Sequence, residues 1–78
     1  MSIYYLDIHN DEVTLDDEGK ELADDHAARA YAVAAVRSLA ADSVRCGHLV
    51  LSHRIDVVNA QRRVIFAVTF ADAIDIRP

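Results

Sequence analysis

Cysteine, proline and glycine are scarce in this chain of 78 residues, which has one cysteine, one proline and two glycines. A single cysteine excludes an internal disulfide and leaves a zinc site without its usual set of thiolates. So few glycines and prolines exclude the collagen-like and linker-like classes. The longest uncharged run in the first half, residues 30–36, is far shorter than the roughly 20 apolar residues that cross a bilayer.

The remaining composition is that of a globular domain, with 53% hydrophobic and 27% charged residues. We expect one domain, residues 1–78, because a chain of this length is too short to divide. Such a chain buries only about 60–65% of the surface that it exposes when unfolded. Its stability therefore depends on efficient packing or on burial against a partner subunit.

Charge is unevenly distributed along the chain, whose formal net charge is −5. Residues 1–25 hold nine acids and one base, whereas residues 26–78 hold seven arginines and four acids. An acidic protein repels a phosphate backbone as a whole, which disfavours nucleic acid as a partner. The first residues show neither the basic nor the apolar region of a secretory signal, and a lone thiol suits a reducing compartment. We expect a cytoplasmic protein that does not enter a membrane.

The first part of the chain is predicted to form a hairpin. A strand over residues 3–9 alternates apolar side chains between two faces, and residues 12–15 return as the second arm after a turn. Residues 16–20 then form an acidic turn in which Gly19 supplies a positive φ.

A long helix is predicted over residues 25–46. Asp24 is a good N-cap, eight alanines favour the helical conformation, and Gly47 ends the helix. Cys46 lies seven residues after Leu39, the last residue of the apolar stripe of the helix. We therefore expect it to be a small core-facing residue.

A second hairpin runs from residues 53–59 to residues 62–70, and its turn at Asn59-Ala60-Gln61 contains no glycine. The order ββαββ predicts an α+β fold, with a four-stranded antiparallel sheet and one helix packed on one face. The apolar positions expected in the core are Tyr4, Leu6, Ile8, Leu22, Ala28, Ala32, Ala35, Leu39, Ile55, Val57, Phe66, Val68 and Phe70.

The last strand is apolar on both sides, as strands are when both faces of a sheet are buried. One helix covers only one face, so the other face needs a second cover. We therefore expect a homodimer with two-fold symmetry, in which sheets or edges meet. The residues expected at this interface are Ile3, Tyr5, Val58, Ile65, Ala67 and Thr69.

Several motifs follow one another in a recognisable order. They are a tyrosine-rich first strand at residues 4–7, the acidic turn D-x-x-G-x-E-L at residues 16–22, an alanine-rich helix, and closing strands at residues 54–58 and 64–70. In this order the chain resembles a family of small uncharacterised bacterial proteins, described as a domain of unknown function. That family tends to have a glycine where this chain has Asn59-Ala60-Gln61. The resemblance implies the fold and adds no catalytic residue.

The acidic segment 16–25 does not fit a calcium-binding EF-hand loop. With Gly19 at the sixth position, Thr14 takes the first and Asp25 the twelfth, where an Asp and a bidentate Glu are required. We interpret this segment as a solvated turn followed by a helix N-cap, and we predict no metal site.

Other polar residues also lack the spacing of a catalytic site. We expect solvated or edge positions for all four histidines, which are His9, His26, His48 and His53. Asp7 and Asp56 meet if their strands are neighbours, and two carboxylates there need a metal or a shared proton. The alternative is that these two aspartates lie on opposite faces or at edges.

Arginines are concentrated in the second hairpin, where Arg54, Arg62 and Arg63 can cluster at one end with Arg45 nearby. Such a cluster is either a phosphate-binding patch or a solvated edge that blocks strand-to-strand aggregation. The acidic net charge favours the solvated edge.

Two classes of function fit these observations. The first is a small non-enzymatic interaction or assembly module that acts through the second sheet face. The second rests on a looser likeness to the HicB-type antitoxins, which also place strands and an acidic turn before an alanine-rich helix. That likeness implies a regulator that holds a basic partner, such as a small toxic ribonuclease, with its acidic turn. We predict neither an enzyme nor a cofactor.

Overall fold

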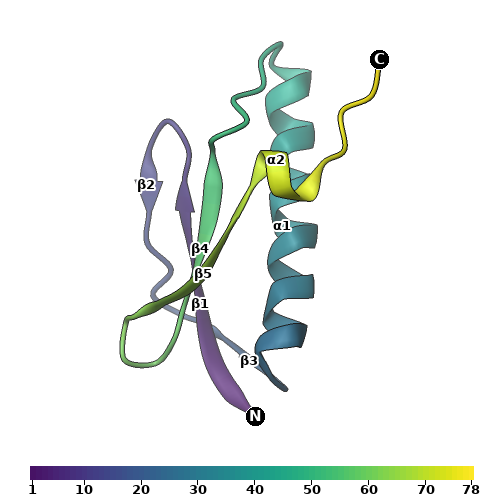
Figure 1. Cartoon of the computed structure of the whole chain (residues 1–78). Helices are drawn as coiled ribbons and strands as arrows, with labels where there is room; N and C mark the ends of the chain where they lie inside the picture. The colour runs from purple at the N-terminus through teal and green to yellow at the C-terminus, as the bar shows by residue number, and fades with distance from the viewer.

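The computed structural model describes all residues, 1–78, and has one layer of sheet with one long helix across it (Figure 1). Strands β1, β2, β4 and β5 form the antiparallel order β2-β1-β4-β5, and β3 pairs with the same edge of β1 as β2. In chain order the elements are β1 (Ser2–His9), β2 (Val13–Thr14), β3 (Lys20–Leu22), α1 (Asp25–Arg45), β4 (Arg54–Val58), β5 (Val64–Thr69) and α2 (Phe70–Ala73).

The predicted α+β class is confirmed, with two additions to the predicted order. Lys20 to Leu22 form a strand against the start of β1, where a turn was expected to continue. Phe70 to Ala73 form a single helical turn, α2, where the last strand was expected to end. The second arm of the first hairpin is only two residues long. No helix is both long and apolar enough to cross a membrane.

Helix α1 begins where the sequence predicts. Asp24 has extended backbone angles, and its carboxylate accepts a hydrogen bond from the backbone N–H of Ala27. The helix ends at Arg45, one residue earlier than expected, because Cys46 is the C-cap and Gly47 takes a φ of 91°. The core-facing placement of Cys46 is wrong: its thiol is exposed, since the last turn of α1 extends beyond the sheet.

The core lies between α1 and one face of the sheet. Small residues line the buried stripe of α1, which lets its axis approach β4 and β5 closely. Phe70, at the start of α2, is the largest fully buried side chain and closes one end of this layer. The fully buried apolar residues include Tyr4, Ala28, Ala32, Val36, Ala40, Ile55, Val57, Val68, Phe70 and Ala73. The expected core residues Leu6, Ile8, Leu22, Ala35, Leu39 and Phe66 pack against them and are partly buried.

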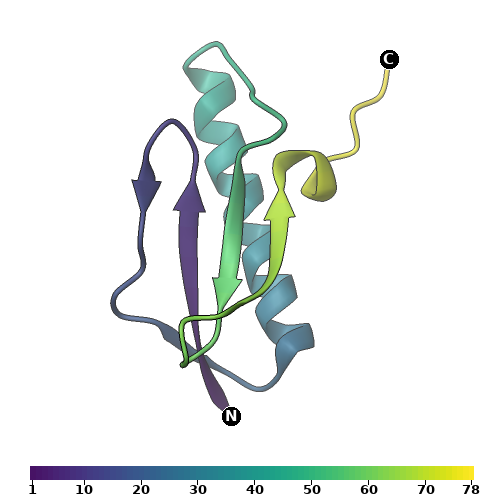
Figure 2. The ribbon, with the colours of Figure 1, turned by 60° about the vertical axis from the view of Figure 1, so that its left-hand side comes forward.

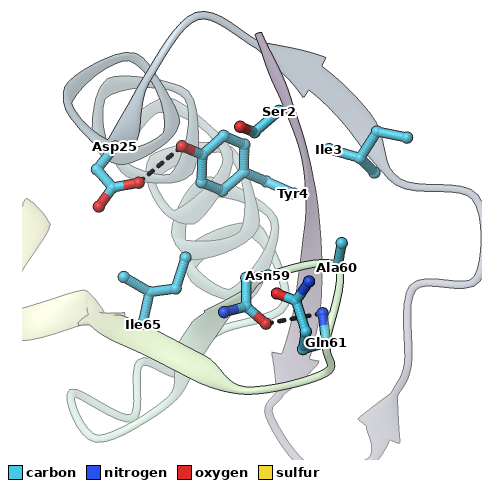
Figure 3. Close-up of a pocket in the computed structure, with 8 residues that line it drawn as sticks. All are labelled: Ser2, Ile3, Tyr4, Asp25, Asn59, Ala60, Gln61 and Ile65. Carbon is cyan, nitrogen blue, oxygen red and sulfur yellow. Dashed lines mark hydrogen bonds between the residues drawn. The ribbon is translucent and has the colours of Figure 1, made fainter.

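A β-bulge interrupts the pairing of β4 with β5. Val57 pairs with Phe66, but the next residue, Val58, pairs with Val64, so Ile65 is the extra residue on β5. Such a bulge changes the face on which a side chain lies. Ile65 lines a hollow beside Tyr4 and the start of α1, instead of joining the opposite face of the sheet (Figure 3).

Candidate interaction surface

The sheet face away from α1 carries a pair of buried aspartates at its centre. Asp7 and Asp56 are direct partners in the register of β1 and β4, and they are only 5% and 9% exposed. Asp7 accepts hydrogen bonds from Nη2 of Arg62 at 2.8 Å and from the backbone N–H of Asp16 at 2.9 Å. Asp56 binds Nε of Arg54 at 2.9 Å and lies 3.1 Å from Nε2 of His9. Each aspartate therefore has at least one basic side chain of the same chain beside it.

The carboxylate of Asp16 completes the edge of β1 in the gap between β2 and β3. It accepts hydrogen bonds from the backbone N–H groups of Leu6 at 3.0 Å, Gly19 at 3.1 Å and Glu18 at 3.0 Å. Burial alone would raise the pKa of Asp16, but these backbone hydrogen bonds, helped by the charge of Arg62, hold that pKa below its ordinary value. Asp16 therefore closes this side of the sheet.

Arg62 reaches this face because its backbone takes a conformation that is uncommon for an arginine. Its φ is 61°, at the end of a turn in which the side chain of Asn59 accepts backbone hydrogen bonds from Gln61 and Arg63. The guanidinium lies over the ring of Tyr5, 5.1 Å from its centroid, on the way to Asp7. The turn thus works without the glycine that is common in such hairpins.

The expected cluster of arginines is not formed. Arg54 lies at the opposite end of β4 from the turn that holds Arg62 and Arg63, because it pairs with Thr69 at the end of β5. Arg45 binds Asp42 on the exposed surface of α1. A second correction concerns His53, for which a solvated or edge position was expected. Its side chain is 13% exposed, packs edge-on against Phe70, and leaves Nδ1 without a hydrogen-bond partner.

Five of the six residues expected at an interface lie on the sheet face away from α1, as the register of β1, β4 and β5 shows, and Ile65 at the bulge is the exception. Ile3 and Tyr5 pack against the acidic turn, within about 3 Å of the position that a Cβ at Gly19 would take. Val58 is buried, at 2% exposure, and Ala67 and Thr69 are on β5, the edge strand. Their part in an interface stays a prediction.

A hollow of about 380 Å³ lies between β1, the start of α1 and the β4–β5 turn (Figure 3). Its central feature is the phenol of Tyr4, which donates a 2.6 Å hydrogen bond to the carboxylate of Asp25. This hydrogen bond, together with burial and the charges of Asp25 and Asp24, raises the pKa of Tyr4 to about 12. The hydrogen bond joins β1, which carries Tyr4, to the first residue of α1, Asp25.

The outer edge of β5 is the longer of the two sheet edges (Figure 2): β5 has six residues, whereas β2 and β3 at the other edge have two and three. The backbone N–H of Phe70 donates to the carbonyl of His53, which makes these two residues a hydrogen-bonded pair. Because such pairs alternate along an antiparallel ladder, every second residue of β5 directs its N–H and C=O toward β4. Phe66 and Val68 direct their backbone groups to β4, so Ala67 directs its N–H and C=O outward. Exposed apolar side chains flank this point at Val64 and Ile65.

Comparison with known proteins places the chain in a family. A family model for a domain of unknown function, DUF6894, matches residues 3–71. The chain belongs to this family. No curated protein and no solved structure matches the chain. The match covers both the acidic turn and all of β5, so the features described above lie within the family domain.

Sequence reasoning raised a meeting of Asp7 with Asp56 but favoured opposite faces or edges for them. The structure makes them direct partners on one face. The roles of Arg62 and Asp16 were missed. The spacing of Asp16 from Gly19 is the signal for its Asx-type turn, but nothing local marks Arg62 as the residue that crosses to Asp7. No three His, Cys, Asp or Glu side chains are arranged to hold a metal ion.

Proposed function

We propose that this chain is a small non-enzymatic interaction module, which associates in the cytoplasm with a second copy of itself through the edge of β5. The observation that carries the proposal is the contrast between the two edges of the sheet. The β5 edge is six residues long and carries exposed Val64 and Ile65, whereas the opposite edge consists of the two-residue β2 and the three-residue β3, with the carboxylate of Asp16 on the backbone N–H of Leu6 between them. Unpaired edges of this kind are templates for pairing with another chain.

The pairing of charged groups supports a role that is not catalytic. The two buried aspartates are each neutralised by an arginine, and the raised pKa of Tyr4 keeps its phenol protonated. A general acid or base needs a titrating group that is free to exchange a proton with a substrate. In this chain the same groups hold strands, turn and helix together.

Sedimentation at micromolar concentration tests the proposal. A dimer is expected at about twice the mass of the 8.6 kDa chain. A species of 8.6 kDa that persists as concentration rises through the micromolar range would contradict it.

A second function, a regulator that holds a basic partner, is favoured by the exposed acids of the segment between β1 and α1. Glu12, Asp17, Glu18 and Glu21 are exposed and form no ion pair within the chain. Co-purification from a native lysate discriminates between the two: a basic ribonuclease that is retained by the wild type and released when these four acids are changed to Asn or Gln supports the regulator. Self-association that the same changes leave intact supports the first proposal.

A further inference from the structure

The free edge of β5 has a geometry that specifies how two copies meet. We propose that β5 of one copy pairs antiparallel with β5 of the other about a two-fold axis at Ala67, which joins two sheets into one. This inference rests on the proposed self-association and adds its register. Ala67 is the residue that directs its N–H and C=O outward in the middle of β5, so two copies of it exchange both hydrogen bonds.

The ends of β5 limit the pairing to a few residues. At the C-terminal end, the backbone N–H of Thr69 donates to the carboxylate of Asp72 at 3.0 Å, and the backbone N–H of Asp72 donates to the hydroxyl of Thr69 at 3.0 Å. The outward donor at Thr69 is therefore occupied. At the other end the bulge at Ile65 breaks the regular ladder. Ala67 lies between these two features.

Charge along the edge favours the antiparallel direction. The end of β5 that follows the turn has Arg63, whose guanidinium forms no ion pair within the chain, and the end that leads into α2 has Asp72. Antiparallel pairing brings Arg63 of each copy toward Asp72 of the other, whereas parallel pairing brings like charges together.

The position of α1 leaves room for a second copy on the β5 side. Arg29 lies over the ring of Phe66, and Nε of Arg37 donates to the carbonyl of Ala73 at 2.8 Å, so these arginines border the edge on the helix side. Between them the surface of α1 has only small or aliphatic side chains, Ala30, Val33 and Ala34, which line a shallow hollow.

Cysteine cross-linking tests the register directly. In a Cys46→Ser background, Ala67→Cys places two thiols opposite each other at the axis, where antiparallel Cα atoms lie about 5.5 Å apart, within the range of a disulfide. We expect mild oxidation to convert most of this variant to a covalent dimer. Val13→Cys in the same background is the matched control, because Val13 is 61% exposed but lies on β2, at the opposite edge of the sheet from β5.

The outcomes separate this inference from the function on which it rests. A wild-type dimer whose Ala67→Cys variant cross-links no better than the Val13→Cys variant overturns the β5 register and leaves self-association standing. A wild-type monomer overturns both. A complementary measurement uses charge: Arg63→Glu is expected to weaken the dimer roughly tenfold, and mixing it with Asp72→Lys is expected to restore association. Circular dichroism of each variant confirms that it is folded, and a failure of two folded variants to complement each other also overturns the register.

Discussion

Asp7 and Asp56 lie opposite each other on β1 and β4, yet each is bound to an arginine from a different end of the second hairpin. Arg62 reaches Asp7 from the turn, and Arg54 binds Asp56 from the first position of β4. Two carboxylates in this register repel each other unless each has a cation. The two ion pairs, Arg62–Asp7 and Arg54–Asp56, therefore hold the turn in a fixed position relative to the sheet.

Removing Arg62 tests this coupling. Arg62→Ala leaves the carboxylate of Asp7 buried with only one hydrogen bond, and we expect a loss of about 1–3 kcal/mol in the free energy of unfolding. The measurement is urea denaturation at neutral pH. Arg77→Ala is the control, since Arg77 and Asp75 form a pair on the exposed C-terminal segment, and pairs of that kind contribute about 0–1 kcal/mol. Equal losses in the two variants would show that the Arg62 contact is of the ordinary surface kind.

Acid should destabilise the protein partly through Asp16. The folded state lowers the pKa of this carboxyl, so its contribution is present above the ordinary value of 3.8 and is lost as the pH falls below it through the folded-state pKa. We expect Asp16→Asn to be less stable than the wild type at neutral pH and to lose less further stability between pH values of about 5 and 2. Urea midpoints across that range provide the measurement. Parallel curves for wild type and variant would contradict the role of Asp16 at the β1 edge.

High pH should destabilise the protein through Tyr4, whose pKa is raised in the folded state. The folded state raises the pKa of its phenol to about 12, so the contribution of the Tyr4–Asp25 hydrogen bond is complete below the ordinary value of 10.0 and is lost as the pH rises toward 12. Spectroscopic titration of phenolate absorbance should show one of the three tyrosines ionising late. Tyr4→Phe should remove that late component, and its persistence in the variant would assign it to another tyrosine.

The two glycines should respond differently to alanine. A Cβ at Gly19 would lie 2.8 Å from Cγ2 of Ile3 and 2.9 Å from Cε1 of Tyr5, whereas a Cβ at Gly47 would meet nothing within 4 Å. Both have a positive φ, so both variants bear the backbone cost of about 1–2 kcal/mol. We expect Gly19→Ala to lose about 1–3 kcal/mol more than Gly47→Ala, because the turn must move off β1. Thermal unfolding of the two variants side by side measures the difference.

The sequence was sufficient for the elements with strong local signals. Asp24, the alanines and Gly47 define α1 almost to the residue, since caps and helix propensity act locally. The alternation in β1 placed Tyr4, Leu6 and Ile8 toward the helix for the same reason. These features depend on neighbours within a few residues along the chain.

Long-range contacts account for what the sequence did not reveal. Pairing of Lys20 to Leu22 with the start of β1 is decided by tertiary contact, and three residues are too few to show a strand period. The bulge that turns Ile65 away from the second face comes from a shift of register between β4 and β5, which leaves no local mark. The expectation of an apolar second face was wrong at its centre, where Asp7 and Asp56 lie on that face among apolar neighbours.

The carboxylate of Asp16, by occupying the backbone N–H of Leu6, has a consequence for the stoichiometry of any assembly built on this sheet. Edge-to-edge pairing of sheets produces a fibre only when every subunit can pair with a neighbour at both edges of its sheet. The edge beside β1 offers only the short strands β2 and β3, with Asp16 between them, so we expect an assembly built through β5 to stop at two copies.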